Sequence, residues 1–412
     1  MPKLVTVFRG PRDLYQVPLA LHEHGYLARH VSEWYSPLDH PILKRVIARQ
    51  GRLHAFLARR YCAGLPSSAV SIVPPAFVSE LTGVMSRGRM GASLERVDAW
   101  LGSYAGAYAR LHESGLLSYS YYAFHAFHRL GNGSGQPRVV FQVHPHPITV
   151  RRLLRDELAK NPDCRDSLSA EQELQLAEQG ARFRQLATEP ELADLCVVNS
   201  TFTKHSLVEN GVSPNKIKLV PYGVDVAAFR PGSRPDDGRF RVLFVGSLIQ
   251  RKGIKYLLEA WKQLALPNSQ LILAGRGQVD SSLLSQYRGL FTHLPNVPPV
   301  KLVALYQQAD LFCLPSLVEG FGLVLLEALA CGTPVVASTH TGAVDLLDGE
   351  LQRLVVEPGS VAQLSERLRW CYDERCGRLA AMRPACRALA ENHSWAAFRD
   401  RLTSQLRPFL AA

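Results

Sequence analysis

The hydrophobic positions follow a repeating order from about residue 194 onward: a short apolar run, a turn, an amphipathic stretch, and then the next apolar run. Short apolar runs bounded by turn residues predict buried strands, and the amphipathic stretches between them predict helices. Alternating strands and helices indicate parallel sheets with helices on both faces, which is an α/β architecture. We expect strands at 194–200, 216–222, 241–247, 270–275, 310–316, 333–338 and 353–358, and helices at 252–264, 302–309 and 360–374.

The first half of the chain has a weaker pattern, with clear strands expected only at 4–8 (LVTVF) and 138–143 (RVVFQV). The stretch RPGSRPDDGR (230–239), rich in Pro, Gly and Asp, precedes the strongest strand of the second half and predicts a linker. We therefore expect a first domain at 1–222, a linker at 223–240, a second domain of about five or six strands at 241–393, and a C-terminal segment at 394–412.

The composition is that of an ordinary soluble globular protein, since 47% of the 412 residues are hydrophobic and 20% are charged. No run of about 20 uninterrupted apolar residues is present, so we expect no transmembrane helix. The eight cysteines are scattered and form no CxxC pair, which favours reduced thiols in a cytoplasmic protein.

The formal net charge of +11 suits nucleic acid, an anionic membrane surface or a phosphate-bearing substrate, and does not distinguish among them. The interleaved aromatic residues that stack on single-stranded bases are missing, so we expect no nucleic-acid partner. Segment 41–61 is basic with a rough apolar face, which is typical either of a helix lying on an anionic membrane, here the inner face of the plasma membrane, or of an ordinary helix with a solvated basic face. Its basic residues are Lys44, Arg45, Arg49, Arg52, Arg59 and Arg60.

The segment PSLVEGFGLVLLEALACGTPVVAS (315–338) predicts a helix that is apolar on nearly all sides yet contains Glu327. Charged residues are almost never fully buried without a partner. Gly320 and Gly322 permit a tight turn before the helix. Its N-terminus follows a strand, so free N–H groups and the positive end of the dipole are expected at the carboxyl edge of the sheet, which suits a phosphate.

A second carboxylate, Glu319, precedes this helix, and about 7 Å of helix axis plus the loop separates it from Glu327. A retaining hydrolase needs carboxyl groups only about 5–5.5 Å apart. We therefore expect the two acids to contact different parts of one extended ligand. The alternative is a solvated Glu319 and a Glu327 that pairs with a neighbouring arginine.

Basic residues and histidines mark two further strand ends. Arg251 and Lys252 lie at the start of a helix, where cations are disfavoured by the dipole, so an anionic ligand is indicated; a solvated basic pair is the alternative. His144 and His146 follow strand 138–143, in a loop that its prolines stiffen. A polar strand end or a functional site would both explain these histidines.

The segment EGFGLVLLE (319–327), followed by ALACGTPVVAS, resembles the E-x7-E signature of the retaining GT-B glycosyltransferases of the GT4 family. Three other stretches resemble this family in the same order, and together they cover nearly the whole second half. They are VVNSTFTKHSLVENGVSPNKIKLVPYGVDVAAF (197–229), VLFVGSLIQRKGIKYLLEAW (242–261) and ADLFCLPS (309–316). The resemblance implies two Rossmann-like domains that face each other across an interdomain cleft, with helix 394–412 crossing back to the first domain.

The resemblance also implies how the donor is bound. Glu327 takes the position that binds the ribose hydroxyls of a sugar nucleotide, and Glu319 is expected beside the hydroxyls and the reacting face of the donor sugar. The backbone N–H groups of Gly320, Phe321, Gly322 and Leu323 are expected to hold the sugar and the diphosphate.

The basic pair has a counterpart in the family. Lys252 matches the lysine that neutralises the leaving diphosphate. Ser247 follows Gly246 where family members often have arginine, so Arg251 is expected to supply that charge.

On the first domain, His144 resembles the active-site histidine near the transferred sugar, with His146 as the alternative. Gly10 lies where the family has a glycine-rich loop facing the donor phosphate and the acceptor. Arg9 and Arg12 are further contacts expected in this loop.

The activity implied is transfer of a sugar from a nucleotide diphosphate donor to a glycan or lipid-linked acceptor, with retention, as in the synthesis of cell-envelope polysaccharides. The resemblance implies that no cofactor or metal is needed; no DxD-type pair is present to hold one, since Asp236–Asp237 lies in the linker. A GT-B sugar-nucleotide epimerase and a non-catalytic nucleotide-sugar-binding protein remain as alternatives. The segments VFRGPRD and GSLIQRKG lack the patterns of a nicotinamide-dependent dehydrogenase and a P-loop enzyme.

Overall fold

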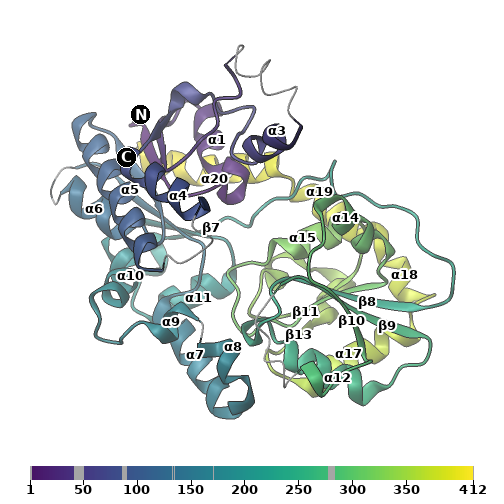
Figure 1. Cartoon of the computed structure of the whole chain (residues 1–412). Coiled ribbons are helices and arrows are strands. Elements are labelled where there is room, and N and C mark those ends of the chain that lie inside the picture. The colour runs from purple at the N-terminus through teal and green to yellow at the C-terminus, as the bar shows by residue number, and fades with distance from the viewer. Residues whose placement is uncertain are drawn as a thin grey trace.

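The computed structural model describes residues 2–40, 51–85, 91–131, 133, 135–169, 171–276 and 284–411. These residues form two α/β domains that lie side by side, each built on one parallel sheet (Figure 1). Of the basic segment 41–61, Lys44, Arg45 and Arg49 lie outside the described residues, and only the backbone of Arg52 is described.

The first domain holds a seven-stranded sheet in the order β3-β2-β1-β4-β5-β6-β7. Its strands are β1 (Leu4–Val7), β2 (Leu27–Ser32), β3 (Val70–Ile72), β4 (Gly115–Tyr119), β5 (Arg138–Gln142), β6 (Leu195–Val198) and β7 (Ile217–Leu219). Its helices are α1 (Gln16–Glu23), α3 (Gly51–Ala58), α4 (Pro74–Met85), α5 (Gly91–Leu111), α6 (Ala123–Leu130), α7 (Pro147–Lys160), α8 (Arg165–Ser169), α9 (Gln172–Gln175), α10 (Ala181–Leu192) and α11 (Thr201–Glu209).

The second domain holds a six-stranded sheet in the order β10-β9-β8-β11-β12-β13. Its strands are β8 (Phe240–Val245), β9 (Ser269–Ala274), β10 (Phe291–Leu294), β11 (Leu311–Leu314), β12 (Val335–Ser338) and β13 (Val355–Val356). The remaining helices are α12 (Ile254–Leu264), α14 (Pro299–Gln308), α15 (Leu323–Ala330), α16 (Ala343–Leu346), α17 (Val361–Asp373), α18 (Arg378–Ala381), α19 (Arg383–Asn392) and α20 (Trp395–Ala411).

The α/β fold with parallel sheets, expected from the alternating pattern, is confirmed, but four strands were not anticipated: β2, β3, β4 and β10. Strand β2 carries a buried histidine, His30, whose ring nitrogen bonds to the Thr6 hydroxyl at 2.9 Å. Strand β10 lies at the sheet edge and is half exposed. Neither strand therefore shows the continuous apolar run that identifies a central parallel strand.

The chain crosses between the domains at two places that lie together. Val224, just after the first domain, forms a parallel bridge with Ser394, and the Trp395 N–H donates to the Val224 carbonyl at 3.2 Å. Helix α20 then runs along the first domain beside α1 (Figure 1). Its Phe398 ring packs 5.7 Å from the Tyr222 ring, and Arg399 pairs with Glu23 of α1.

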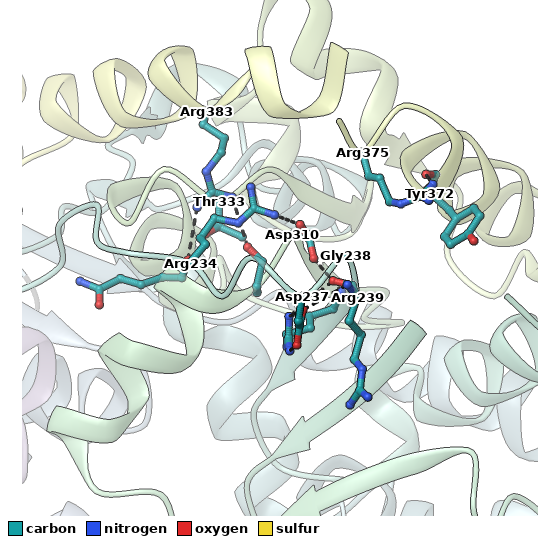
Figure 2. Close-up of polar contacts among 12 residues, drawn as sticks. Arg234, Asp237, Gly238, Arg239, Asp310, Thr333, Tyr372, Arg375 and Arg383 are labelled. Carbon is teal, nitrogen blue, oxygen red and sulfur yellow. Dashed lines mark hydrogen bonds and ion pairs between the residues drawn. The ribbon is translucent and has the colours of Figure 1, made fainter. Parts of the chain in front are cut away.

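The connection between β7 and β8 is held at the N-terminal edge of the second sheet (Figure 2). Arg234 forms an ion pair with Asp310, whose side chain is 6% exposed. The second oxygen of Asp310 accepts from the Arg241 N–H at 2.7 Å. Arg241 in turn donates to Asp237 with both terminal nitrogens. This edge is opposite the carboxyl ends of the strands, so the connection between β7 and β8 leaves those ends free.

All eight cysteines are free thiols, and six of them are buried. Among the described residues, no helix is both long enough and apolar enough to cross a membrane.

Asp310→Asn should destabilise the second domain by about 1–3 kcal/mol, because it removes the charge that faces Arg234 and one of two acceptor oxygens in a buried position. The measurement is the melting temperature by differential scanning calorimetry. Asp237→Asn, at a side chain that is 46% exposed, is the matched control and should cost less. Equal melting temperatures for Asp310→Asn and the wild type would contradict this assignment.

Candidate functional site

The carboxyl ends of the two sheets meet at Gly320, in the loop between β11 and α15. The Ser200 hydroxyl, which follows β6, donates to the Gly320 carbonyl at 2.5 Å. A Cβ atom at Gly320 would lie 1.9 Å from the Val143 carbonyl oxygen and 3.6 Å from the Cα of His144. Only glycine allows this approach of two backbones, which brings His144 next to loop 319–322.

A second contact between the domains holds the loop that carries Lys252. The buried carboxylate of Glu157, on α7, accepts from Gln250 Nε2 at 2.6 Å and from the Tyr256 hydroxyl at 2.7 Å. The Gln250 N–H donates to the Ser167 hydroxyl at 2.8 Å. The turn before α12 is therefore fixed against α7 and α8 of the first domain, which lie beside the second domain in Figure 1.

Arg251 lies in the same turn and has its charge already balanced by the first domain. Its Nη1 atom is 2.9 Å from Glu171 and 3.6 Å from Glu173. Its Nε atom donates to the Val318 carbonyl at 3.2 Å. The structure thus places Arg251, expected at the donor, in a bridge between the domains.

Lys252 and Glu319 form an ion pair in which Nζ donates to Oε2. Both side chains are mostly buried, with 21% and 15% of their surfaces exposed. Burial lowers the pKa of Lys252 to about 8, and the positive charge of Arg251 adds to this shift. A cation and a carboxylate from two different loops are therefore held together at the domain junction.

Glu327 lies inside α15 and has a tyrosine, not an arginine, as its partner. The Tyr306 hydroxyl on α14 donates to Glu327 Oε2 at 2.8 Å. Burial raises the pKa of Glu327, and the bond from Tyr306 opposes the shift. Within the described ranges Oε1 has no hydrogen-bonding partner, so the carboxylate can still accept from a ligand.

The N-terminus of α15 is open. Gly322 has φ +85°, and a Cβ atom there would lie 2.9 Å from Leu314, so the turn requires glycine. Within the described part of the chain, the N–H groups of Gly320, Phe321 and Gly322 and of Leu323, the first helical residue, find no protein acceptor. The Phe321 ring is buried against Tyr222. Such an end favours an anion.

Gly246 directly follows β8 and lines a cavity of about 510 Å³. The wall is completed by Gly275, Arg276 and Asn296 of the second domain, and by Arg59 of the first. Ser247 is exposed beside this cavity. A flat ligand group would fit between these loops.

The structure separates the two histidines that follow β5. His146 is 1% exposed and caps α7: its Nδ1 accepts from the Ile148 N–H at 3.3 Å, and its Nε2 lies 3.0 Å from the Ala187 carbonyl. His144 instead lines a cavity, and its Nδ1 has no hydrogen-bonding partner within the described ranges. His144 is therefore the histidine that is placed to contact a ligand.

The His144 ring is held neutral. Burial lowers its pKa to about 3, and the nearby charges of Arg251, Arg12 and Lys252 add to the effect. The Tyr121 ring packs edge-on against it at 6.0 Å. A neutral imidazole can donate or accept a hydrogen bond without carrying charge.

Tyr121 is a site residue that the sequence did not indicate. Its φ of +82° is unusual for a bulky residue. The buried carboxylate of Glu189 accepts from the Tyr121 N–H at 2.8 Å and from the Phe124 N–H at 3.1 Å. Burial raises the pKa of Glu189 to about 7. Glu189 thus stabilises the strained backbone that presents Tyr121 to His144.

Gly10 ends the first strand segment with φ +73°, but its N–H donates to both oxygens of Glu33 at 3.1 Å. Glu33 is fully buried and pairs with Arg60. The backbone donor expected for a phosphate is therefore already occupied by a carboxylate. Arg9 and Arg12 lie in the cavity that contains His144.

Within the described ranges, no group of three His, Cys, Asp or Glu side chains is arranged to hold a metal ion.

Solved structures of similar fold cover the whole chain. Sucrose-phosphate synthase from Thermosynechococcus elongatus superposes with a TM-score of 0.69 at 18% identity, over 99% of both chains. HepE from Anabaena, in complex with UDP, gives a TM-score of 0.61 at 17% identity, over 99% of this chain and 100% of that one. The fold is therefore the two-domain GT-B fold, as expected.

Residues 225–392 match the family model described as glycosyl transferases group 1. The D-inositol 3-phosphate glycosyltransferase of Rhodococcus jostii (strain RHA1) is 34% identical over 239 residues, which are 52% of each chain. An uncharacterized glycosyltransferase of Methanocaldococcus jannaschii is 32% identical over 170 residues, which are 39% of this chain and 43% of that protein. The chain thus spans about half the length of these relatives. The match of residues 225–392 to the glycosyl transferases group 1 model confirms the resemblance seen in the sequence of the second domain.

The ring of His144 should stay neutral between pH 5 and pH 8, because its native pKa is near 3. Its ring signals in an NMR titration, assigned by their loss in His144→Gln, should not move over this range. Because the unfolded ring takes up a proton near pH 6.5, the buried ring should lower the free energy of unfolding as the pH falls below about 6.5. A titration midpoint between pH 6 and pH 7 would show a solvated ring and contradict this assignment.

Proposed function

We propose that this chain transfers a sugar from a nucleoside diphosphate sugar to a hydroxyl group of an acceptor, with retention at the anomeric carbon. The observation that carries the proposal is the assembly, at one domain junction, of Lys252, Glu319, the open α15 N-terminus and Glu327. Neither domain supplies the site alone, because His144 comes from the first domain and the other groups from the second.

The diphosphate would bind at the N-terminus of α15, where free N–H groups and the helix dipole favour negative charge. Lys252 would exchange its present partner Glu319 for the diphosphate. Glu319 would then be released to accept hydrogen bonds from the hydroxyls of the donor sugar. The ion pair therefore holds both groups in place until the donor replaces it.

Glu327 would accept from the ribose hydroxyls through its free Oε1, while Tyr306 keeps Oε2 in position. The nucleobase would occupy the cavity beside Gly246 and Gly275. HepE has been solved in complex with UDP and with UDP-glucose, so uridine nucleotides are the first donors to test.

During transfer the bond between the anomeric carbon and the diphosphate oxygen breaks, and the acceptor oxygen bonds to the same face of that carbon. The negative charge that grows on the diphosphate would be stabilised by Lys252 and the α15 N-terminus. His144 would contribute a neutral hydrogen bond to the transferred sugar through its unpartnered Nδ1. Because these groups supply the positive field, we propose that the reaction needs no metal.

The acceptor we propose is a glycan or a lipid-linked sugar made in the cytoplasm for the cell envelope. WaaG, a glycosyltransferase involved in lipopolysaccharide biosynthesis, has a similar fold with a TM-score of 0.60 at 14% identity. Contact of the basic segment with an anionic membrane belongs to the same proposal. A sugar-nucleotide epimerase would instead release a free sugar when no acceptor is present, which separates the two activities.

A thermal-shift panel of UDP, GDP, ADP and CDP tests the donor site, each with and without EDTA. One nucleotide should raise the melting temperature of the wild type, since a ligand at a hundredfold excess over Kd stabilises by about 2.7 kcal/mol. Glu327→Ala and Lys252→Ala should lose most of this shift.

Glu191→Ala and Lys160→Ala, at exposed positions of the first domain, are the matched controls and should keep the shift. A wild type that none of the nucleotides stabilises would count against the proposal. A shift abolished by EDTA would rule out a metal-free donor site.

A further inference from the structure

The cavity of about 640 Å³ that contains His144 belongs entirely to the first domain. Among the residues that line it are Arg9, Arg12, Asp98, Tyr122 and His144. These come from the loop after β1, from α5, and from the ends of β4 and β5. All five side chains can form hydrogen bonds, so the cavity suits a hydrophilic ligand.

The charge of Asp13 stabilises the Arg12 guanidinium through space, but the two form no ion pair within the described ranges. No carboxylate lies within ion-pair distance of its guanidinium, and no acceptor receives a hydrogen bond from it. Its Cζ lies 6.0 Å from the ring centroids of Tyr119 and Tyr122. The aromatic rings hold the side chain in place while its N–H donors stay available.

The Arg9 side chain likewise forms no ion pair or hydrogen bond within the described ranges. Only its backbone N–H forms a hydrogen bond, to the Tyr122 hydroxyl at 3.2 Å. Its Nη1 atom is buried and has no partner within the described part of the chain. A buried guanidinium donor without an acceptor is costly, so a missing acceptor is indicated.

Asp13 and Asp98 act on the charges of these arginines through space, but their direct contacts are with other residues. Asp13 accepts from the Tyr119 hydroxyl. Asp98 lies 3.5 Å from Arg182, and its Oδ1 is buried with no hydrogen-bonding partner in the described ranges. The exposed Glu95 also lines the cavity, which therefore offers guanidinium donors together with two carboxylate acceptors.

We propose that this cavity binds the acceptor through an oxyanion, a phosphate monoester or a carboxylate, that Arg9 and Arg12 hold, while Asp98 accepts from an acceptor hydroxyl. Planar guanidinium groups bind both oxyanions with paired hydrogen bonds. This inference rests on the proposed function, because it takes the ligand to be the sugar acceptor.

The position of the cavity supports an acceptor rather than the donor. Its lining includes none of the second-domain groups assigned to the donor, whereas His144 belongs to it. His144 is also close enough to Lys252 and Arg251 for their charges to affect its ring. An acceptor held by the arginines would thus end beside the donor sugar.

Calorimetric titration of the full chain saturated with UDP, or with whichever nucleotide stabilises it most, tests the assignment. The probes are inorganic phosphate, glucose 6-phosphate, glucuronate and uncharged glucose. We expect an anionic probe to bind more tightly than glucose, and the two sugar acids show which oxyanion is preferred. Arg12→Gln and Arg9→Gln should each lower the affinity for that anionic probe roughly tenfold to a hundredfold. Arg184→Gln, at an exposed position on α10, is the matched control and should leave that affinity unchanged.

Nucleotide binding distinguishes the two proposals and also reports folding. If Arg12→Gln and Arg9→Gln keep their affinity for the nucleotide and lose affinity for the anionic probe, the inference holds. If nucleotide binds but glucose binds as well as the anions, the inference fails and the donor site stands. If the variants lose nucleotide affinity instead, the arginines serve the donor, which also overturns the inference. If the wild type binds no nucleotide, the proposed function itself fails.

Discussion

The approach of Gly320 to the Val143 carbonyl is the constraint on which the site depends, because it joins the carboxyl edges of two separate sheets. A side chain at position 320 would overlap the first-domain backbone, since even a Cβ atom would lie 1.9 Å from the carbonyl oxygen. The Ser200 hydroxyl completes the contact by donating to the Gly320 carbonyl. Through this one point, His144 of the first domain comes beside the loop that carries Glu319.

The charged groups around this point are arranged in two ways. Those that join the domains have protein partners, as Arg251 has in Glu171. Those proposed to bind a ligand can still form hydrogen bonds: Glu327 has a free oxygen, and the Arg12 guanidinium forms no ion pair or hydrogen bond within the described ranges. Lys252 and Glu319 satisfy one another, and a diphosphate can replace the carboxylate at little cost in charge balance. The side chains that join the two domains are therefore different from those proposed to bind the ligand.

The fold and the second domain were largely predictable from the sequence, whereas the first domain was not. The second-domain strands other than β10 were predicted from short apolar runs, and Glu319 to Glu327 form a motif within one segment, so local pattern carries the information. The partners of that motif are far away in the chain: Tyr306 reaches Glu327 from another helix, and Glu157 reaches Gln250 from the other domain. No local pattern predicts such contacts. The choice between His144 and His146 also needed the tertiary fold, because only packing shows which ring caps α7.

Small-angle X-ray scattering of Gly320→Ala tests most directly whether this contact holds the two domains together. The added methyl group should force the domains apart, so the radius of gyration should exceed that of the wild type. Gly377→Ala is the control, because a Cβ atom there would lie 3.3 Å from the flexible end of Glu374 and 3.9 Å from the Glu374 carbonyl oxygen, which is an ordinary contact. Identical scattering from Gly320→Ala and the wild type would show that the contact does not set the closed arrangement, and would contradict the account.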